Sequence, residues 1–366
     1  MMSLLKQAFE NRTVLVTGHT GFKGAWLSLW LRELGAHVIG YALDPPSVPN
    51  LFEAIGLRQM LTHHHGDIRD HTHLLAIFKE YQPEVVFHLA AQPLVRFSYE
   101  EPRMTYETNV MGTVNVLEAI RCTESVRAAV IVTSDKCYEN REWLWGYREC
   151  DPMGGRDPYS SSKGCAELVT SAYLQSFFSP ERYGDGHRVA LASARAGNVI
   201  GGGDWGHDRL IPDCVKALAK GEEVAIRNPR AIRPWQHVLE PLSGYLLLAA
   251  GLLSEGPRFA GPWNFGPADR EIWRVGEVVQ EVYRLWGKGC PRNMADAASQ
   301  QNHHPHEAQW LKLDSSKALV ELGWKPKYSV HDALVKTVEW YQQFYDGQGE
   351  NALLDYTRQQ IEAYSS

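Results

Sequence analysis

The stretch TVLVTGHTGFKG, residues 13–24, decides the fold. Its β-branched and apolar first half predicts a buried strand, and a helical pattern over residues 25–34 follows directly. Glycines at this junction allow a tight turn, let backbone N–H groups approach a pyrophosphate and pack the helix against the strand. The helix N-terminus adds a partial positive charge. A glycine pattern alone could also mark a merely tight turn, but its position between a strand and a helix favours a dinucleotide-binding loop.

Further apolar runs follow this loop, separated by helical stretches. We expect strands at residues 37–42, 61–65, 84–90 and 128–133. Runs that are apolar on both faces predict a parallel sheet covered by helices on both sides. The sequence therefore predicts an α/β protein with a doubly wound Rossmann sheet in residues 1–200, to which the chain returns near 234–265. The Gly-, Pro- and Trp-rich remainder, 201–366, predicts a smaller, mixed α/β substrate-binding part.

Composition excludes several classes of protein. The 366 residues are 44% hydrophobic and 22% charged, which is typical of globular proteins, and 37 Lys and Arg against 43 Asp and Glu give a net charge of −6. Such a balance argues against nucleic acid as a partner. No apolar run approaches the roughly 20 residues of a membrane span, and the first residues lack the apolar core of a signal peptide. Six scattered Cys without a CxxC pair favour a reducing, cytoplasmic location.

Two acidic residues near strand ends predict how a dinucleotide is held. Asp44 follows the second predicted strand, where a carboxylate accepts hydrogen bonds from the adenosine ribose and repels a 2′-phosphate. This position favours NAD over NADP, although Asp44 would equally suit a loop before two prolines. Asp67 and Ile68 follow the third predicted strand, where they are placed to hold adenine.

Two short motifs predict the chemistry. In YSSSK, residues 159–163, Tyr159 and Lys163 share one face of a helix that Pro158 can begin. A cation one turn away, together with a positive nicotinamide, stabilises a phenolate whose pKa is otherwise about 10. The motif TSDK, residues 133–136, ends the fifth predicted strand. Its hydroxyls can bind the reacting alcohol, and its Asp-Lys pair suits a reaction with additional proton transfers. Taken alone, either motif also fits a solvated surface.

With these residues in hand, the chain resembles the extended short-chain dehydrogenase/reductase family, in its branch acting on nucleotide sugars. The resemblance runs from Val14 to about Pro326, and its features are the glycine loop, HLAAQ (88–92), Asn109, Ser134, DPYSSSK (157–163), RAGNVIG (195–201), RPWQHV (233–238), WNFG (263–266) and the segment 317–325. The resemblance implies bound NAD. The predicted cofactor contacts are Gly18, Thr20, Gly21, Phe22, Lys23, Gly24, Asp44, Asp67, Ile68, Leu89, Ala90, Ala91, Asn109, Thr133, Tyr159 and Lys163.

Within the family the chain is most similar to dehydratases that take CDP-glucose, whose products feed deoxysugar and O-antigen biosynthesis. The resemblance implies oxidation of the hexose at C4, loss of water across C5 and C6, and reduction at C6. The predicted catalytic residues are Ser134, Asp135, Lys136, Tyr159 and Lys163. Asp135 is interpreted as the acid at C6 and Lys136 as the base at C5. Lys136 stands where other branches carry Glu, which leaves the C5 base open.

The same resemblance implies a substrate-binding set: Gln92, Asn198, Arg209, Arg233, Asn264 and His306. A guanidinium suits a diphosphate, and the context of Arg233 is the most distinctive. His306 could equally be a loop histidine and Asn264 a turn cap. We expect no metal site, because no carboxylate or Cys pattern completes the two histidine clusters. Family analogy implies a homodimer or a dimer of dimers, formed through the Tyr159 helix and the helix containing residues 113–120.

Three alternatives remain open at this stage. A dehydratase for another nucleotide sugar, or a nucleotide-sugar 4-epimerase, would share NAD, Tyr159 and Lys163. The Asp135-Lys136 pair argues against a simple epimerase. A non-catalytic dinucleotide-binding regulator would be expected to lack Tyr159 or Lys163, and both are present.

Overall fold

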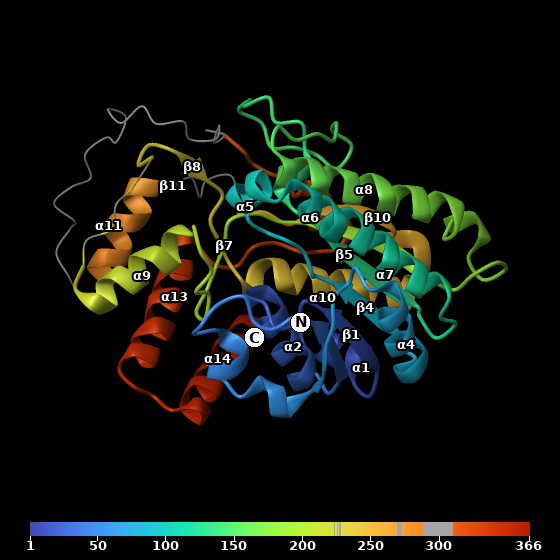
Figure 1. Cartoon of the computed structure of the whole chain (residues 1–366), viewed down its shortest axis with the longest axis horizontal. Coiled ribbons are helices and arrows are strands. Elements are labelled where there is room, and N and C mark those ends of the chain that lie inside the picture. The colour runs from blue at the N-terminus through green and yellow to red at the C-terminus, as the bar shows by residue number, and fades with distance from the viewer. Residues whose placement is uncertain (223, 225, 227, 269–272, 288–309) are drawn as a thin grey trace.

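A computed structural model of the chain describes residues 1–222, 224, 226, 228–268, 273–287 and 310–366. Its centre is a seven-stranded parallel sheet, crossed by helices on both sides (Figure 1). In spatial order the strands are β10 (Gly261–Asn264), β6 (Ala190–Arg195), β5 (Ala128–Val132), β4 (Val85–His88), β1 (Thr13–Thr17), β2 (His37–Ala42) and β3 (Thr62–His65). The chain order reverses direction between β1 and β4, which is where doubly wound sheets bind ligands.

Alternate residues of the central strands enter two separate apolar cores. Val14 and Val16 of β1 belong to one core, whereas Leu15 between them belongs to the other. On neighbouring β4, Val85 and Val86 divide in the same way. Because successive side chains point to opposite faces, a strand that is apolar throughout must be covered twice. This confirms the α/β, doubly wound fold expected from the sequence.

The helices form two layers on the sheet. The layer on the Leu15 side contains α4 (His71–Tyr81), α7 (Gly112–Arg121) and α8 (Pro158–Ser176), with α5 (Val95–Glu100), α6 (Pro102–Tyr106) and the π-helical turn η2 (Glu107–Met111) alongside. The opposite layer contains α1 (Met2–Phe9), α2 (Phe22–Glu33), α3 (Leu51–Ala54), α10 (Leu239–Glu255) and α14 (Glu350–Ser365). Helix α2 begins three residues earlier than predicted, because Gly21 already serves as its N-cap.

The second half of the chain also builds a smaller lobe. It consists of α9 (Leu210–Lys220), α11 (Val275–Leu285) and α13 (Val330–Tyr345), with α12 (Ser316–Glu321) against β10. Two small sheets pair β7 (Val199–Ile200) with β9 (Gln236–His237), and β8 (Ile232–Arg233) with β11 (Trp273–Arg274). The remaining short turns are η1 (Leu57–Met60), η3 (Asp135–Cys137), η4 (Pro180–Arg182) and η5 (Gly256–Phe259). Because β10 and α10 pack on the main sheet, the exact domain division stays a prediction.

A buried carboxylate joins the C-terminal segment to the main body. Glu240 on α10 accepts hydrogen bonds from the backbone N–H groups of Lys327 and Tyr328 and from the Tyr364 hydroxyl at 2.6 Å. Burial raises the pKa of Glu240. None of the helices in the described ranges has the length and hydropathy needed to cross a bilayer.

Candidate active site

The glycine loop lies at the point where the order of the sheet reverses. Gly18 has a φ of +77°, and a Cβ there would lie 2.7 Å from the backbone N of Ala90. A Cβ on Gly24 would lie 2.1 Å from the carbonyl oxygen of Gly18. Gly21 caps α2 without any side-chain hydrogen bond, so the first N–H groups of the helix remain available to an anion. The loop therefore fits the pyrophosphate of a dinucleotide.

A buried histidine connects the two strands on either side of this point. His88, at the end of β4, contacts the hydroxyl of Thr17 through Nδ1 at 2.7 Å and that of Thr113 through Nε2 at 3.1 Å. Burial, assisted by the charge of Lys163, lowers the pKa of His88 to about 3. The imidazole is therefore neutral at physiological pH, and it fixes the strand ends beneath the loop. The motif around His88 contributes to the family resemblance, but no role was predicted for this residue from the sequence.

The predicted adenosine-binding residues follow β2 and β3. Asp44 is largely exposed, with its carboxylate 3.5 Å from His65 Nε2. Thr20 donates a hydrogen bond to the carbonyl of Leu43 at 2.9 Å, which ties the glycine loop to this strand end. Asp67 is paired with Arg69; burial opposes its ionisation, but the Arg69 hydrogen bonds outweigh burial and lower the pKa of Asp67. Ile68 beside it is buried.

The segment after β4 is held by paired amide contacts. Leu89, Ala90 and Ala91 line this strand end, and Asn109 in η2 exchanges hydrogen bonds with the backbone of Gln92 at 2.8 and 3.0 Å. Asn109 also donates to the hydroxyl of Ser162 on α8 at 2.8 Å. The Gln92 side chain bonds within its own neighbourhood, to Leu94 O and to Thr105. These contacts fix the segment, and the predicted ligand contacts of its residues stay predictions.

The structure brings Ser134, Tyr159 and Lys163 together in a buried group. Asp157 caps α8 by accepting from Ser160 N at 2.8 Å, so Tyr159 and Lys163 lie on its first turns. Burial raises the pKa of Tyr159 to about 12, partly offset by its hydrogen bond with Ser134. Burial and then the charge of Lys23 lower the pKa of Lys163 to about 8. The sequence predicts a lowered pKa for Tyr159, but in the chain without a cofactor this pKa is raised. A lowered pKa therefore stays a prediction for the protein with bound cofactor.

Asp135 and Lys136 occupy the turn η3, directly after β5. Ser134 caps this turn and donates a hydrogen bond to Asp135 Oδ1 at 2.9 Å. Asp135 is only 2% exposed, and its other oxygen, Oδ2, has no partner among the described residues. Gly197 leaves room for this carboxylate, because a Cβ at that position would overlap it. Lys136 is half-buried beside it. A buried, unpartnered carboxylate oxygen is suited to a reacting hydroxyl group.

Lys23 approaches the same group from α2. Its Nζ lies 6.0 Å from the centre of the Tyr245 ring. Burial and the charge of Arg209 lower the pKa of Lys23 to about 8, while Asp135 opposes this shift. The ring of Phe22 lies against Gly201, where an added Cβ would be 3.1 Å from its Cζ atom. Lys23 therefore lies beside the catalytic residues as well as in the glycine loop.

The predicted substrate-binding residues lie on several different segments. Asn198 has a φ of +48° between β6 and β7, and Arg233 lies on β8. Arg209 caps the N-terminus of α9 and pairs with Asp204 at 2.7 Å. Its charge also opposes the rise in the Tyr159 pKa, which places it near the catalytic group. Their contacts with a substrate stay predictions.

Asn264 is the last residue of β10, and its side chain is bonded within the chain. Asn264 is fully buried; its Oδ1 accepts from Tyr138, and its Nδ2 donates to Tyr147 O at 2.8 Å and to Asp314 O at 3.1 Å. These bonds give it a structural role, and its substrate contact stays a prediction. His306 lies outside the described residues. Within the described ranges, no group of three or more His, Cys, Asp or Glu is arranged to hold a metal ion.

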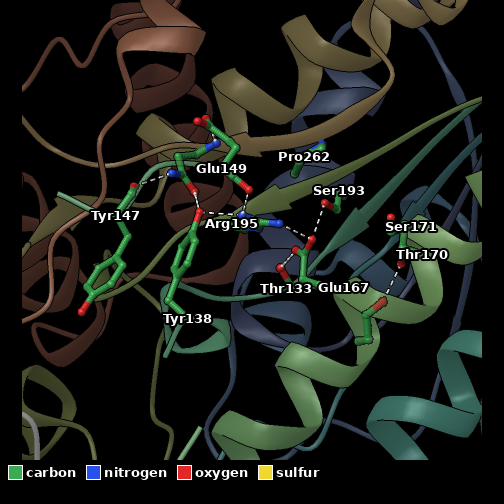
Figure 2. A network of polar contacts seen from close by, with 12 residues as sticks. Thr133, Tyr138, Tyr147, Glu149, Glu167, Thr170, Ser171, Ser193, Arg195 and Pro262 are labelled. Atoms are coloured by element: carbon green, nitrogen blue, oxygen red, sulfur yellow. Dashed lines mark hydrogen bonds and ion pairs between the residues drawn. The ribbon is translucent and has the colours of Figure 1, made fainter. Parts of the chain in front are cut away.

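A polar network behind the site was not predicted from the sequence (Figure 2). Arg195, at the end of β6, pairs with Glu167 on α8 at 2.7 Å. Glu167 also accepts from Thr133 and Ser193, and Arg195 donates to the Tyr138 hydroxyl. Spacing could have suggested one part of it, because Glu167 follows Lys163 by four residues. Its partners come from segments far apart in the sequence.

Comparison with known proteins identifies the family of this chain. The family model described as GDP-mannose 4,6 dehydratase matches residues 15–337. The chain belongs to this family. A CDP-glucose 4,6-dehydratase from Salmonella typhimurium is 53% identical over 361 residues, which cover 99% of this chain and 98% of that protein. A UDP-glucose 4-epimerase from Halalkalibacterium halodurans is 29% identical over 88% of this chain and 93% of its own. The predicted resemblance to nucleotide-sugar dehydratases of the extended short-chain family is thereby confirmed.

Solved structures share the fold of this member of the GDP-mannose 4,6-dehydratase family. A dTDP-glucose 4,6-dehydratase from Streptomyces venezuelae, solved with NAD and TYD bound, is 25% identical and has a TM-score of 0.72 over 90% of this chain and 97% of its own. A UDP-glucose 4-epimerase from Stenotrophomonas maltophila has a TM-score of 0.78 at 22% identity, over 92% of this chain and 99% of its own. The second likeness concerns the fold alone.

Proposed function

We propose that this chain is an NAD-dependent hydro-lyase that converts CDP-glucose to CDP-4-keto-6-deoxyglucose. The observation that carries the proposal is the buried Asp135, whose free carboxylate oxygen lies beside Ser134 and the Tyr159–Lys163 pair. Epimerisation at C4 needs no acid at C6, whereas water loss does. Identity of 53% to a CDP-glucose 4,6-dehydratase supports the nucleotide and the reaction together.

The glycine loop and the strand ends fit NAD. Close packing of Gly18 on Ala90 and of Gly24 on Gly18 leaves no room for side chains at these two positions, so that a pyrophosphate could approach the backbone closely. When bound, NAD supplies a hydride acceptor for C4 of the sugar and afterwards a hydride donor for C6. Asp44 would accept hydrogen bonds from the adenosine ribose, and Asp67 and Ile68 would border the adenine.

Tyr159 would remove the proton from the hexose O4. Its pKa of about 12 in the chain alone is too high for a base near neutral pH. The ammonium of Lys163 and the positive ring of the bound nicotinamide would lower it. Ser134 would hold O4 through a hydrogen bond. The resulting ketone at C4 acidifies the hydrogen at C5.

Asp135 and Lys136 would then eliminate water. A base removes the C5 proton, the C5–C6 double bond forms, and the C6–O6 bond breaks as an acid protonates the departing hydroxyl. We assign Asp135, in its protonated form, as the acid that would donate this proton from its unpartnered Oδ2. Lys136 is the candidate base, which would take the proton from C5 and return it when C6 is reduced. Arg209 and Arg233 would hold the diphosphate, because planar guanidinium forks match phosphate oxygens.

Replacing Lys136 with Met tests the assignment of the base. We expect exchange of the C5 hydrogen with solvent deuterium to fall by roughly 10²-fold or more, while oxidation at C4 still reduces bound cofactor. The measurement is mass-spectrometric detection of deuterium in the sugar, beside absorbance of the reduced cofactor. The exposed Lys220→Met variant is the control. C5 exchange at the wild-type rate in Lys136→Met would remove the assignment.

The choice of nucleotide is tested by incubating the NAD-loaded protein with CDP-, dTDP-, UDP- and GDP-glucose separately, and with GDP-mannose. We expect turnover with CDP-glucose to exceed that with each of the others by at least roughly tenfold in kcat/KM, which corresponds to about 1.4 kcal/mol of discrimination. Faster turnover of another nucleotide sugar would reassign the substrate within the same family.

Exposed apolar side chains along α8 and along the helical run from α6 to α7 support a homodimer. Met111 in η2 and Leu168 on α8 are 52% and 60% exposed, and Tyr106 in α6 and Phe177 at the end of α8 also expose large apolar surface. Helices α6 and α7 follow each other through η2, and both pack against α8 (Figure 1). Packing this patch against the same patch of a second subunit would bring together two helices from each subunit. The assembly would then be a dimer or a dimer of dimers.

The Leu168→Glu variant tests this contact. We expect a shift towards monomer, because a charge in a buried apolar contact costs several kcal/mol. The measurement is mass by light scattering across a protein dilution series. Val320→Glu is the matched control, since Val320 is 80% exposed on α12. A monomeric wild-type protein, or an unchanged mass of Leu168→Glu, would contradict the contact.

The cysteines support a cytoplasmic location for the enzyme. Cys122, Cys137, Cys150, Cys165 and Cys214 are all free thiols. Free thiols persist in reducing compartments.

A 4-keto-6-deoxy sugar is reactive at its carbonyl. Reductases, aminotransferases or epimerases that build deoxysugars, including those of O-antigen, would consume this product.

A further inference from the structure

The ion pair between Glu167 and Arg195 lies behind the catalytic residues, away from solvent. The two side chains are 4% and 3% exposed, and Glu167 Oε2 lies 2.7 Å from Arg195 Nη2. The same oxygen accepts from Ser193 at 2.7 Å, and Oε1 accepts from Thr133 (Figure 2). Glu167 thus connects α8 to the ends of β5 and β6. Sequence comparison and the proposed reaction assign no role to either residue.

Glu167 lies one helical turn after Lys163 on the same face of α8. Thr133, which donates to Glu167, directly precedes Ser134. One carboxylate therefore contacts the backbone segment that carries Ser134 and Asp135, and lies near the lysine that Tyr159 depends on. A shift of Glu167 would therefore move the segment that carries Ser134 and Asp135 relative to Lys163 on α8.

The other end of the ion pair contacts the segment between η3 and α8. Arg195 Nη1 donates to the Tyr138 hydroxyl at 2.5 Å and to Glu149 O at 3.1 Å, and its guanidinium lies 4.9 Å from the centre of the Tyr138 ring. Tyr138 in turn donates to Asn264 Oδ1 at 2.8 Å. All these contacts hold the guanidinium in one orientation, so the position of Glu167 is fixed from two sides.

The contribution of a buried ion pair to folding stability does not by itself explain why Glu167 and Arg195 are present. Burying two charges carries a desolvation cost that their attraction often only balances, and apolar residues of similar volume can be equally stabilising. The negative charge has a local use, because burial and the charge of Lys23 both lower the pKa of Lys163 while Glu167 opposes them. Further titratable groups near Lys163 are Tyr159 of α8, Cys137 of η3 and the neutral His88 of β4.

We propose that Glu167, held by Arg195, is a positioning residue that fixes the Thr133-Ser134 strand end against α8 and supplies the charge that keeps the Lys163 ammonium protonated during turnover. The inference rests on the proposed function, in which Lys163 acts as a cation beside Tyr159. It assigns the ion pair to the reaction, although neither residue touches the substrate.

The Glu167→Gln variant tests the inference through the pH dependence of kcat/KM. Loss of the negative charge should let Lys163 lose its proton more easily, so the alkaline decline should move to lower pH by about one unit. Glu167→Asp keeps the charge, and we expect its decline within about 0.3 units of the wild type even where kcat falls. Glu240→Gln removes another fully buried carboxylate, away from the site, and should lower thermal stability without moving the decline.

A double variant and a direct titration of Lys163 test the inference even if the single variant does not fold. The double variant Glu167→Gln with Arg195→Gln leaves no unpaired buried charge, and it should show a shift in the same direction if the single variant does not fold. Competitive acetylation of Lys163 across pH, read by mass spectrometry, reports its protonation without substrate. An unshifted decline and an unshifted Lys163 titration in a folded charge-free variant would overturn the inference. Absence of turnover by the wild type would instead contradict the proposed function.

Discussion

We expect the replacement of Tyr159 with Phe to lower kcat by roughly 10³-fold and to leave the affinity for NAD and the nucleotide sugar within a few fold. The hydroxyl is the group that accepts the O4 proton, and the ring that remains fills the same buried space. The measurement is steady-state turnover beside the dissociation constants of both ligands. The account therefore expects a loss in kcat rather than in KM.

Tyr173→Phe is the matched control for this variant. Tyr173 lies on the same helix, and its hydroxyl bonds to Glu118 at 2.8 Å, on the side of α8 that faces α7. Its loss should leave kcat nearly unchanged. If Tyr159→Phe retained more than about a tenth of wild-type kcat, another group would have to remove the O4 proton.

Replacing Lys163 with Met gives the second large effect. We expect kcat/KM near neutral pH to fall by roughly 10²- to 10³-fold, because Tyr159 loses the cation that opposes its burial. In the wild type the pKa of Lys163 is lowered to about 8. The ammonium is therefore present below about pH 8 and lost above it, so wild-type activity should decline through that range and Lys163→Met should lack this decline.

Lys23→Met provides the comparison of opposite sign. The charge of Lys23 lowers the pKa of Lys163, so its removal should move the alkaline decline to higher pH. The measurement is a full pH profile of kcat/KM for all three proteins. A wild-type profile that stays flat well above pH 8, with Lys163→Met equally active, would exclude the assigned role of Lys163.

The fold and the reacting group were predictable because their signals are local. Glycines between residues 18 and 24 and the spacing of Tyr159 and Lys163 each lie within a few residues of one another. The patterns of the inner strands were recognisable because these strands are buried on both faces, which makes β1, β4 and β5 mostly apolar. The beginning of α2 was misplaced by three residues, since the sequence pattern did not show that Gly21 would cap it. The strand predicted at 84–90 is shorter, Val85–His88, and β6 was not predicted as a strand.

The buried polar network was not predictable in the same way. Glu167 and Arg195 are 28 residues apart, and Tyr138 and Asn264 are 126 apart, so no local pattern brings them together. The many tryptophans illustrate the same limit. Trp205 and Trp324 proved to be core residues, 3% and 2% exposed. Trp324 also donates a hydrogen bond to Ser243 at 2.9 Å. A surplus of aromatic residues indicated a well-packed second half without indicating which of them contact a ligand.

The most direct test of the central claim is the mass of the sugar product formed from CDP-glucose by the NAD-loaded protein. The account predicts a nucleotide sugar lighter than the substrate by one water, carrying a ketone at C4 that borohydride reduces, with no net consumption of NAD. A product of unchanged mass, with only the configuration at C4 altered, would contradict the dehydratase assignment and favour an epimerase.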